Sequence, residues 1–346
     1  MIKLERPKLL DKLQIVAPAL ATTVVESTQL LCFDGKNVTA YNDHIAIRVK
    51  FASEFVGCVN GTLLLALLGS SDADHIRIDS NGKEMELKTA ISRFHLALKP
   101  VESFTFKMPE NAGDEIDVTT ELTDAVKLCL LSVGTDANIA DQLGITFIAG
   151  KAIIDLYATD NKTITHARVI PDTKLENAFY DRCIVPKEFC EQLAQAPEGT
   201  VLKIGNRHCR FATKEKTVIG SLVHSKSPYD FEATIKRHMS KTAQFETLPE
   251  KLKEALGRAV ILSKASPQEV PTRARVVNEI LTLETKSEVG VVTDSLDFAV
   301  SNLETSFDAD LLLRACDHFI KLCITDRSIA LCDVKGNKFL MASRGA

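Results

Sequence analysis

The chain has 346 residues, of which 45% are hydrophobic and 25% are charged, and its formal net charge is −4. This composition is typical of a soluble globular protein, and the length allows two or three domains. No run of about 18 apolar residues could span a bilayer, and the N-terminus lacks the apolar core of a signal peptide. An acidic chain is also a poor candidate for gripping nucleic acid over its whole surface. We expect a cytosolic protein with no membrane partner.

The nine cysteines are scattered along the chain, and no two are separated by only two residues. The usual spacing of a zinc site is therefore absent. His208-Cys209 and Cys316-Asp-His318 are the nearest to metal clusters, but neither has a second pair of ligands at a usable spacing. We expect reduced, mostly buried thiols and no metal or other cofactor.

The first third of the chain predicts a helix, three strands, a second helix and three more strands. Apolar residues at three- and four-residue steps indicate the helices, and Asp34-Gly35 is a strong hairpin signal between two strands. The expected elements are helix 7–20, strands 29–34, 37–41 and 45–49, helix 59–68, and strands 75–79, 83–88 and 92–98.

The same order of elements recurs twice. Leu63, Phe189 and Leu311 occupy matching positions in the three second helices, 126 and 122 residues apart. The second copy reads helix 121–133, strands 144–148, 152–157 and 163–169, helix 186–196, and strands 201–204, 207–211 and 218–223. The third reads helix 252–260, strands 279–284, 289–292 and 298–300, helix 307–315, and strands 320–325, 329–332 and 338–341.

A recurrence of this size indicates repeated domains. Each copy has two helices with one apolar stripe and strands with one apolar face, and packing both helices on one side of a curved antiparallel sheet buries them economically. The sequence therefore predicts an α+β protein of three tandem domains, residues 1–113, 114–244 and 245–346, with boundaries in polar or turn-rich stretches.

Motifs that carry chemistry are missing. The sequence has no Gly-x-x-x-x-Gly-Lys-Ser/Thr loop, no Gly-x-Gly-x-x-Gly after a strand, no Gly-x-Ser-x-Gly and no His-Glu-x-x-His. Thr-Asp pairs recur at predicted strand ends, where an Asp more often satisfies turn amides than catalyses. A binding or scaffold protein is favoured over an enzyme.

The ordered set of segments resembles the bacterial beta sliding clamp, the processivity subunit of DNA polymerase III, over nearly the whole chain. The segments that carry the likeness are Arg93-Phe-His-Leu96, Tyr157-Ala-Thr-Asp160, Ser227-Pro-Tyr-Asp-Phe231, Ala259-Val-Ile-Leu-Ser263, Cys323-Ile-Thr-Asp326 and Phe339-Leu-Met341. The resemblance implies a head-to-tail homodimer that closes a ring of six domains around double-stranded DNA, with helices inside. It also implies a DNA polymerase and a clamp loader as partners.

Two protein-binding surfaces follow from the resemblance. The implied dimer interface comprises Phe94, Leu96, Ile261 and Leu262, for which a place in the domain core is the alternative. The implied pocket for short motifs of partner proteins comprises Leu143, Thr159, Ile164, Pro228, Ile235, Leu311 and Met341. The sequence departs from the family at Asn161-Lys-Thr163, at Leu311 and in the tail 341–346, so the pocket is a candidate for a different motif.

A third implied surface is the DNA channel. Lys8, Lys12, Lys127, Lys253 and Arg258 lie on the first helices of the repeats, away from the apolar stripes, and an ordinary solvated face is the alternative. Residues 19–25 carry no Arg, unlike the corresponding loop of the family. Lys264, Arg273 and Arg275, in the expected third-repeat loop, are candidates to replace it.

Two other functions remain open from the sequence. The first is a clamp-like protein that binds clamp-binding motifs without being loaded on DNA. The second is an enzyme whose site is not recognisable. A two-domain trimeric clamp, like proliferating cell nuclear antigen, is disfavoured by the third repeat.

Overall fold

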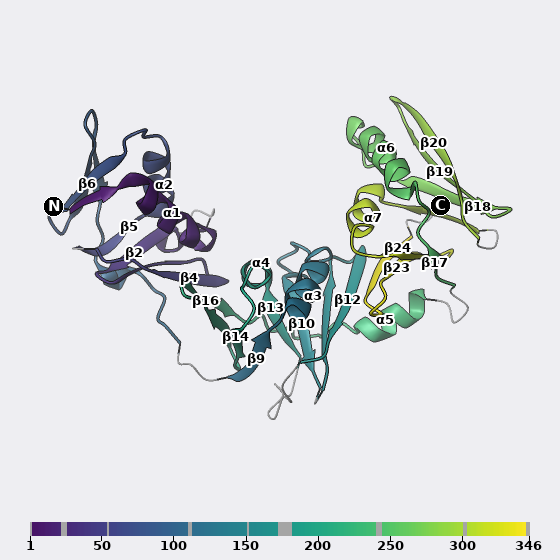
Figure 1. The fold of residues 1–346 in the computed structure, drawn as a ribbon, viewed down its shortest axis with the longest axis horizontal. Coiled ribbons are helices and arrows are strands. Elements are labelled where there is room, and N and C mark those ends of the chain that lie inside the picture. Colours follow the sequence, from purple (N-terminus) through teal and green to yellow (C-terminus); the bar gives the residue numbers. More distant parts are fainter. Residues whose placement is uncertain are drawn as a thin grey trace. The chain divides into compact units, whose positions relative to one another are not determined.

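The structure, a computed structural model, describes residues 2–21, 26–53, 55–109, 113–150, 152–171, 182–239, 244–299 and 303–343. The chain divides into two compact units, whose helices and strands are labelled in Figure 1. Unit 1 comprises residues 1–123 and 171–223, and unit 2 comprises residues 124–170 and 224–346. The middle third of the chain is thus divided between the units, and the three-domain division stays a prediction.

Unit 1 contains two antiparallel sheets. A four-stranded sheet has the order β1 (Ile2–Glu5), β6 (His75–Ser80), β7 (Glu84–Lys88) and β8 (Arg93–Ala97). An eight-stranded sheet has the order β5 (Val56–Asn60), β2 (Leu30–Asp34), β3 (Asn37–Tyr41), β4 (Ile45–Lys50), β16 (Lys216–Ser221), β15 (His208–Ala212), β14 (Thr200–Ile204) and β9 (Asp114–Val118). The helices are α1 (Arg6–Val16), α2 (Gly61–Gly69) and α4 (Lys187–Leu193), the last preceded by β13 (Cys183–Pro186).

Unit 2 repeats this plan. The strands that unit 2 supplies to one sheet follow the order β10 (Gly144–Ala149), β11 (Ile154–Thr159), β12 (Thr163–Val169), β24 (Lys338–Ala342), β23 (Ser328–Cys332), β22 (Lys321–Ile324) and β17 (Glu246–Thr247). A four-stranded sheet runs β20 (Gly290–Asp297), β19 (Ile280–Ser287), β18 (Thr272–Val277) and β21 (Leu303–Phe307). The helices are α3 (Thr120–Leu130), α5 (Phe231–His238), α6 (Leu252–Ala265) and α7 (Ala309–Ala315). Short 3₁₀ turns lie in unit 1 at Ala17–Ala19, Glu26–Gln29 and Val101–Ser103, and in unit 2 at Ala140–Gln142.

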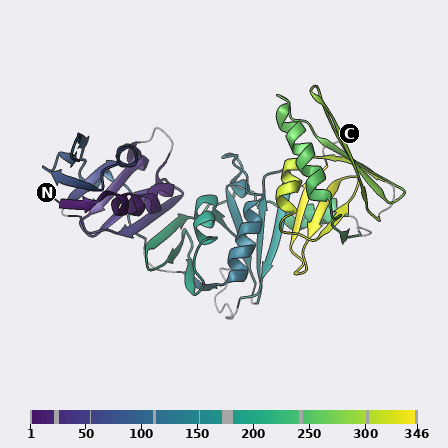
Figure 2. The same cartoon turned by 45° about the horizontal axis from the view of Figure 1, so that its top comes forward.

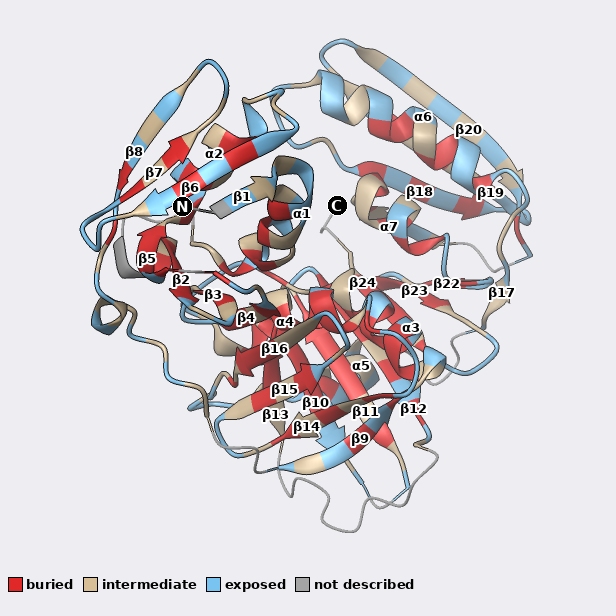
Figure 3. Cartoon of the chain, turned by 60° about the vertical axis from the view of Figure 1, so that its left-hand side comes forward, coloured by how far each residue is buried: buried red, intermediate tan, exposed pale blue. Residues whose placement is uncertain are grey.

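The packing of α6 shows how a helix stripe and a sheet face make a core. Leu256, Ala259 and Val260 are buried along one side of α6. They join Ala274 and Val276, the alternate residues of β18, in the core cluster of unit 2. Figure 2 shows α6 lying along this sheet, and Figure 3 shows buried and exposed bands on the helix. The helix therefore covers one face of the sheet, and the other face of β18 is exposed.

The hairpin predicted at Asp34-Gly35 is confirmed. The Asp34 carboxylate accepts hydrogen bonds from the backbone N–H groups of Lys36 (2.9 Å) and Asn37 (2.6 Å). Gly35 has a φ of 87°, a left-handed conformation that costs little without a Cβ. Helices were also predicted at α1, α2, α3, α4, α6 and α7, and the structure has them. The predicted α+β class with antiparallel sheets is confirmed.

Several elements differ from the prediction. β1, β5, β9, β17, β18, β21 and α5 were not predicted, and the expected helix 59–68 begins only at Gly61, because Val59 and Asn60 belong to β5. The expected strand 298–300 is wrong because Phe298 and Ala299 lie outside the strands, while Val300 lies outside the described residues. β18 was not predicted as a strand because its inward residues Thr272 and Ala274 are small. Their alternation with exposed arginines therefore gives only a weak apolar pattern. The apolar face of α5 is also short, with only Phe231 fully buried.

All nine cysteines are free thiols, and seven of them are buried. Burial raises the pKa of Cys316 to about 12 and that of Cys323 to about 11, so both stay protonated at neutral pH. Among the described residues, no group of three or more His, Cys, Asp or Glu could hold a metal ion. No helix in the described part of the chain is both long and apolar enough to cross a membrane.

The core of unit 1 offers a matched pair for a stability measurement. Leu64 is 1% exposed on α2, and its neighbour Leu63 is 48% exposed. We expect Leu64→Ala to lower the free energy of unfolding by about 2–5 kcal/mol, because it leaves a cavity. Leu63→Ala should cost about 1 kcal/mol or less, since that side chain is already half in water. Urea denaturation followed by circular dichroism measures both, and equal losses would contradict this burial pattern.

Candidate peptide pocket and nucleic-acid interface

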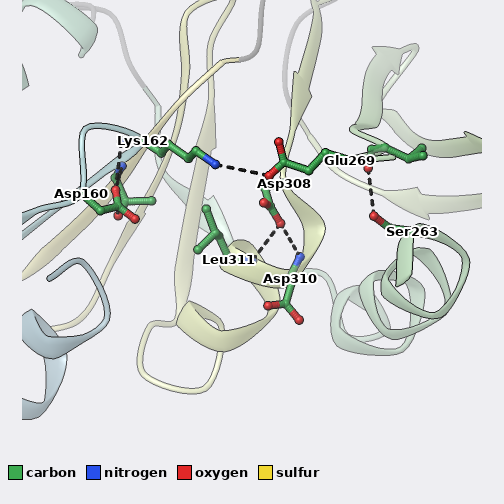
Figure 4. A network of polar contacts seen from close by, with 9 residues as sticks. Asp160, Lys162, Ser263, Glu269, Asp308, Asp310 and Leu311 are labelled. Carbon is green, nitrogen blue, oxygen red and sulfur yellow. Dashed lines mark hydrogen bonds and ion pairs between the residues drawn. The ribbon is translucent and has the colours of Figure 1, made fainter. Parts of the chain in front are cut away.

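A pocket of about 380 Å³ lies in unit 2. Four segments supply its walls: the β11–β12 turn, the stretch after α6, the start of α7 and the end of β24. The lining residues are Asn161, Lys162, Glu269, Asp308, Leu311, Met341, Ala342 and Ser343. Figure 4 shows Leu311 beside the ion pair of Lys162 and Glu269.

The β11–β12 turn is built by its Thr-Asp pair. The Asp160 carboxylate accepts hydrogen bonds from the backbone N–H groups of Lys162 (2.9 Å) and Thr163 (2.6 Å). The Thr159 hydroxyl donates to the backbone carbonyl of Thr163 over 2.8 Å. Asn161 takes a φ of 67°, which an Asn tolerates better than most residues. The turn is therefore structural, as predicted for the Thr-Asp pairs, and it holds Asn161 and Lys162 at the pocket.

The start of α7 forms the facing wall. Asp308 is the N-cap, and its carboxylate accepts hydrogen bonds from the backbone N–H groups of Asp310 (3.0 Å) and Leu311 (3.3 Å). This cap sets where the helix begins. Leu312 points into the core of unit 2, whereas Leu311 is only partly buried and lines the pocket.

An ion pair spans the pocket. The Lys162 Nζ donates to a Glu269 carboxylate oxygen over 3.3 Å, and the two residues are 107 positions apart in the sequence. Both side chains are more than half exposed, so the pair contributes at most about 1 kcal/mol. An incoming ligand could part it at low cost. The pocket thus combines an apolar floor of Leu311 and Met341 with a polar, adjustable rim.

The seven residues predicted for this pocket are not all brought together. Leu311 and Met341 line it, and Thr159 builds its turn. Ile164 pairs in register with Leu340, one residue away from Met341, so Ile164 and Met341 point to opposite faces of the sheet. Ile164 packs instead with Phe231 and Ile235 in a separate cluster.

The remaining two predicted residues also lie apart from the pocket lining. Pro228 is exposed in the segment before α5, and Leu143 is half-buried at the end of a 3₁₀ turn. Of the other lining residues, Asn161, Lys162, Ala342 and Ser343 belong to the two segments in which the sequence departs from the family, and Glu269 and Asp308 were not indicated by the sequence. Glu269 lies 107 positions from Lys162 in the sequence, so no pattern within one segment could have joined the two residues.

The cluster on the opposite face of this sheet is aromatic. Tyr157 stacks on Phe231 of α5 with ring centroids 4.9 Å apart and on His166 with centroids 4.4 Å apart. The His166 Nε2 lies 2.7 Å from an Asp155 carboxylate oxygen. Burial nevertheless lowers the pKa of His166, although the Asp155 contact opposes this. The neutral ring is thereby kept as a packing surface beneath α5.

The cations predicted for a DNA surface are exposed or half-buried on α1, α3 and α6, and most are bonded to carboxylates. Lys8 pairs with Glu5 (2.9 Å), Lys127 with Asp124 (3.0 Å), Lys253 with Asp317 (2.8 Å), Arg258 with Asp294 (2.7 Å) and Lys264 with Asp310 (2.9 Å). Lys12 forms no ion pair within the described residues.

Arg273 and Arg275 require a correction. Both were expected in a loop together with Lys264, but Lys264 lies in the last turn of α6, and Arg273 and Arg275 lie on β18. Their side chains are exposed on the face of the sheet opposite to Ala274 and Val276, which pack beneath α6. Arg273 forms an ion pair with Glu304 of β21. A surface made by the helices therefore excludes both arginines.

The residues predicted for a dimer interface lie on or beside two edge strands. Phe94 is half-buried and Leu96 is buried on β8, which ends its four-stranded sheet. In unit 2, β20 ends the other four-stranded sheet, and Ile261 of α6 is 72% exposed. Leu262 lies next to β20, because a Cβ built on Gly290 would be 3.8 Å from its Cδ1. Leu96 belongs to the core of its own sheet, whereas Ile261 offers free apolar surface.

The cap of α7 can be tested by itself. Asp308→Ala removes the acceptor for two backbone N–H groups and should cost about 0.5–2 kcal/mol of stability. Asp308→Asn keeps a side-chain oxygen at the cap and should stay close to the parent protein. Thermal and urea denaturation would measure the two variants side by side. Equal destabilisation would show that these hydrogen bonds do not hold the pocket wall.

No family model and no curated protein sequence matches the chain. Solved structures do match it along its whole length. The DNA polymerase III subunit beta from Pseudomonas aeruginosa has a TM-score of 0.80 at 18% identity, with 100% of both chains covered. DNA polymerase III beta subunit from Thermotoga maritima has a TM-score of 0.79 at 14% identity, with 100% of this chain and 99% of that chain covered. The Helicobacter pylori beta clamp, bound to a DNA ligase peptide, has a TM-score of 0.78 at 15% identity, with 100% of both chains covered. The chain therefore has the fold of the bacterial DNA polymerase III beta subunit, the sliding-clamp fold.

Proposed function

We propose that the protein is a DNA sliding clamp, a ring of two copies that encircles duplex DNA and tethers a DNA polymerase. The observation that carries this proposal is the match to beta subunits, which spans the whole of both chains. Fold alone is a weak guide to function when the chemistry of a site decides the activity. A clamp works by topology, so the complete fold is itself the functional feature.

The proposal treats the protein as a non-enzymatic processivity factor that acts in the cytoplasm. Clusters of polar residues in unit 2 have structural explanations: the Thr159-Asp160 pair builds a turn, and Asp308 caps a helix. The side chains of Thr159, Asp160 and Asp308 thus have structural roles in the turn and the helix cap. This supports a protein that binds partners and does not transform a substrate.

The pocket at Leu311 and Met341 is proposed to take a short peptide motif from the polymerase, the clamp loader or other partners. Its apolar floor and polar rim suit an extended peptide with one or two apolar anchors. The Helicobacter pylori clamp was solved with a DNA ligase peptide, which supports peptide binding on this fold. Leu143, Thr159, Ile164, Pro228 and Ile235 stay predicted contacts of the same or a neighbouring surface.

Ring closure is proposed to pair β8 of one copy with β20 of the other. Both strands are edges of four-stranded sheets, and an edge offers unpaired N–H and C=O groups to a second chain. Ile261 and Leu262 would add apolar contact beside β20. DNA would then pass along the helices, near Lys8, Lys12, Lys127, Lys253, Arg258 and Lys264.

A second candidate is a clamp-like protein that binds motif peptides and is not loaded on DNA. The observation that favours it is the pairing of the helix cations with carboxylates, which reduces their attraction for phosphate. Both candidates use the same pocket. They differ in whether the protein encircles DNA.

Retention on circular DNA separates the two candidates. A sliding clamp, incubated with a bacterial clamp loader, ATP and nicked circular DNA, should co-elute with the circle and be lost when the circle is linearised, because only topology holds it. Gel filtration of the labelled protein measures this retention. A protein that never co-elutes yet binds a clamp-binding peptide, such as the ligase peptide, would establish the second candidate.

The dimer interface can be tested by one charge. Leu262→Asp should convert the protein to monomers in sedimentation velocity, since it places a carboxylate in the proposed apolar contact. Val334→Asp is a suitable control, because Val334 is 84% exposed and lies far in sequence from both edge strands. Circular dichroism would establish that both variants are folded. A Leu262→Asp variant that sediments as the parent dimer does would remove this residue from the interface.

A further inference from the structure

The helices proposed to face DNA are almost neutral once their bonded partners are counted. Helices α1, α3 and α6 carry seven Lys and Arg residues and four Asp and Glu residues. Four more carboxylates, from Glu5, Asp294, Asp310 and Asp317, are bonded to these cations from neighbouring elements. Arg314 of α7 also pairs with Asp310, so eight positive charges face eight negative ones. α2 adds no charge, because its sequence is Gly-Thr-Leu-Leu-Leu-Ala-Leu-Leu-Gly.

The ion pairs are of two kinds. Lys127 with Asp124 and Lys8 with Glu5 are pairs three residues apart on or beside one helix. The three pairs of α6 reach other elements: Asp294 lies on β20, Asp310 on α7, and Asp317 follows α7. These three carboxylates come from elements other than α6, so the fold of unit 2 places them. The tertiary structure therefore brings one acid to each cation of α6.

Arg258 is held most firmly. Its Nη2 donates to Asp294 Oδ1 over 2.7 Å and its Nε donates to Asp294 Oδ2 over 3.2 Å, a two-point contact that uses the same face a phosphate would use. The contact with Asp294 raises the pKa of Arg258. The hydrogen bond from Lys253 lowers the pKa of Asp317, and that from Lys8 lowers the pKa of Glu5. These acids are therefore ionised at neutral pH and neutralise the cations that they contact.

Arg6 is the remaining charged residue at the start of α1, and it is also engaged. Its Nε donates to the Ala73 carbonyl over 2.8 Å and its Nη1 to the Leu68 carbonyl over 3.0 Å. Of the seven cations, Lys12 alone has no ion pair or hydrogen bond within the described residues. A DNA phosphate that approaches Lys8, Lys127, Lys253, Arg258 or Lys264 therefore competes with a carboxylate that is already bound there.

We propose that the carboxylates of Glu5, Asp124, Asp294, Asp310 and Asp317 act as built-in competitors of DNA phosphate and set how weakly these helices hold DNA. The inference rests on the proposed function, and it adds the residues that limit the grip. Each cation that neutralises a phosphate releases condensed counterions, and this release gives DNA binding its steep salt dependence. A cation already neutralised by a carboxylate gains less from the exchange. A ring of this kind would stay on DNA because it is closed, and weak attraction to the phosphates would let it slide along the duplex.

Equilibrium binding to a short fluorescein-labelled duplex tests this directly, without a loader. The test variant is the triple substitution Asp124→Asn, Asp294→Asn and Asp317→Asn, which keeps the shape of each side chain and removes its charge. The parent protein should bind weakly, with a shallow slope of log affinity against log salt concentration. The variant should bind more tightly at low salt, and its slope should steepen by up to about 2.7, or roughly 0.9 for each cation released to a phosphate.

The matched control is the triple substitution Glu198→Gln, Glu215→Gln and Glu288→Gln. It changes the net charge by the same amount at exposed acids that form no ion pair within the described residues. Its slope should equal that of the parent. Equal steepening of the slope in both triple variants would overturn the proposal, because net charge alone would then explain it. An unchanged slope in both variants would also overturn it, because the carboxylates would then not compete with phosphate.

A second variant ties the effect to one pair. Asp317→Asn should steepen the slope by itself, and adding Lys253→Met should return it to the parent value, because Lys253 is the cation that Asp317 neutralises. A slope that stays steep in the double variant would contradict the proposal. Retention of the parent protein on circular DNA is independent of this slope. A retained protein with an unchanged slope would refute the inference alone, whereas loss of retention would refute the clamp function.

Discussion

The structure depends on one constraint, that each helix has a single apolar stripe and must bury it against a single face of a sheet. In unit 2 the stripe of α6 meets Ala274 and Val276 of β18. This contact determines which residues lie on the outer side of the helix and on the far face of the sheet. The cations of α6 lie on the outer side of the helix, and Arg273 and Arg275 lie on the far face of the sheet. In this register the cations of α6 and the two arginines of β18 lie on opposite sides of the layer that the helix and the sheet form.

The same alternation divides the surface expected to bind peptides. Met341 and Leu340 are adjacent in β24, yet one belongs to the core beneath α7 and the other to the aromatic cluster beneath α5. The pocket accordingly takes its floor from Met341 and Leu311 and its rim from turns and helix starts. Those rim residues are placed by backbone hydrogen bonds, to Asp160 at one side and Asp308 at the other. A rigid frame that carries an easily parted ion pair is a suitable design for recognising short peptides.

Charge is distributed in a way that agrees with a protein that holds DNA by enclosure. A surface that binds phosphate strongly needs free Lys and Arg donors, and strong binding at many positions would oppose sliding. Here five of the seven cations on α1, α3 and α6 are paired with carboxylates from the same helix or from neighbouring elements. Each exposed pair contributes little to stability, about 1 kcal/mol or less. The competition with phosphate proposed above would add up over the five paired cations.

The sequence by itself determined the number and order of the main helices, most strands, the α+β class and the likeness to sliding clamps. The elements and the class follow from local information: apolar periodicity, turn residues such as Asp34-Gly35, and the recurrence of Leu63, Phe189 and Leu311. The likeness to sliding clamps rests on the resemblance of an ordered set of segments such as Tyr157-Ala-Thr-Asp160. Only the tertiary structure decided which residues share a surface. The parity of β12 against β24 separated Ile164 from Met341, the pairing of β18 removed two arginines from the helix side, and the approach of β20 and α7 to α6 supplied its carboxylate partners. Contacts between residues distant in sequence depend on register and packing, and periodicity within a segment carries no information about either.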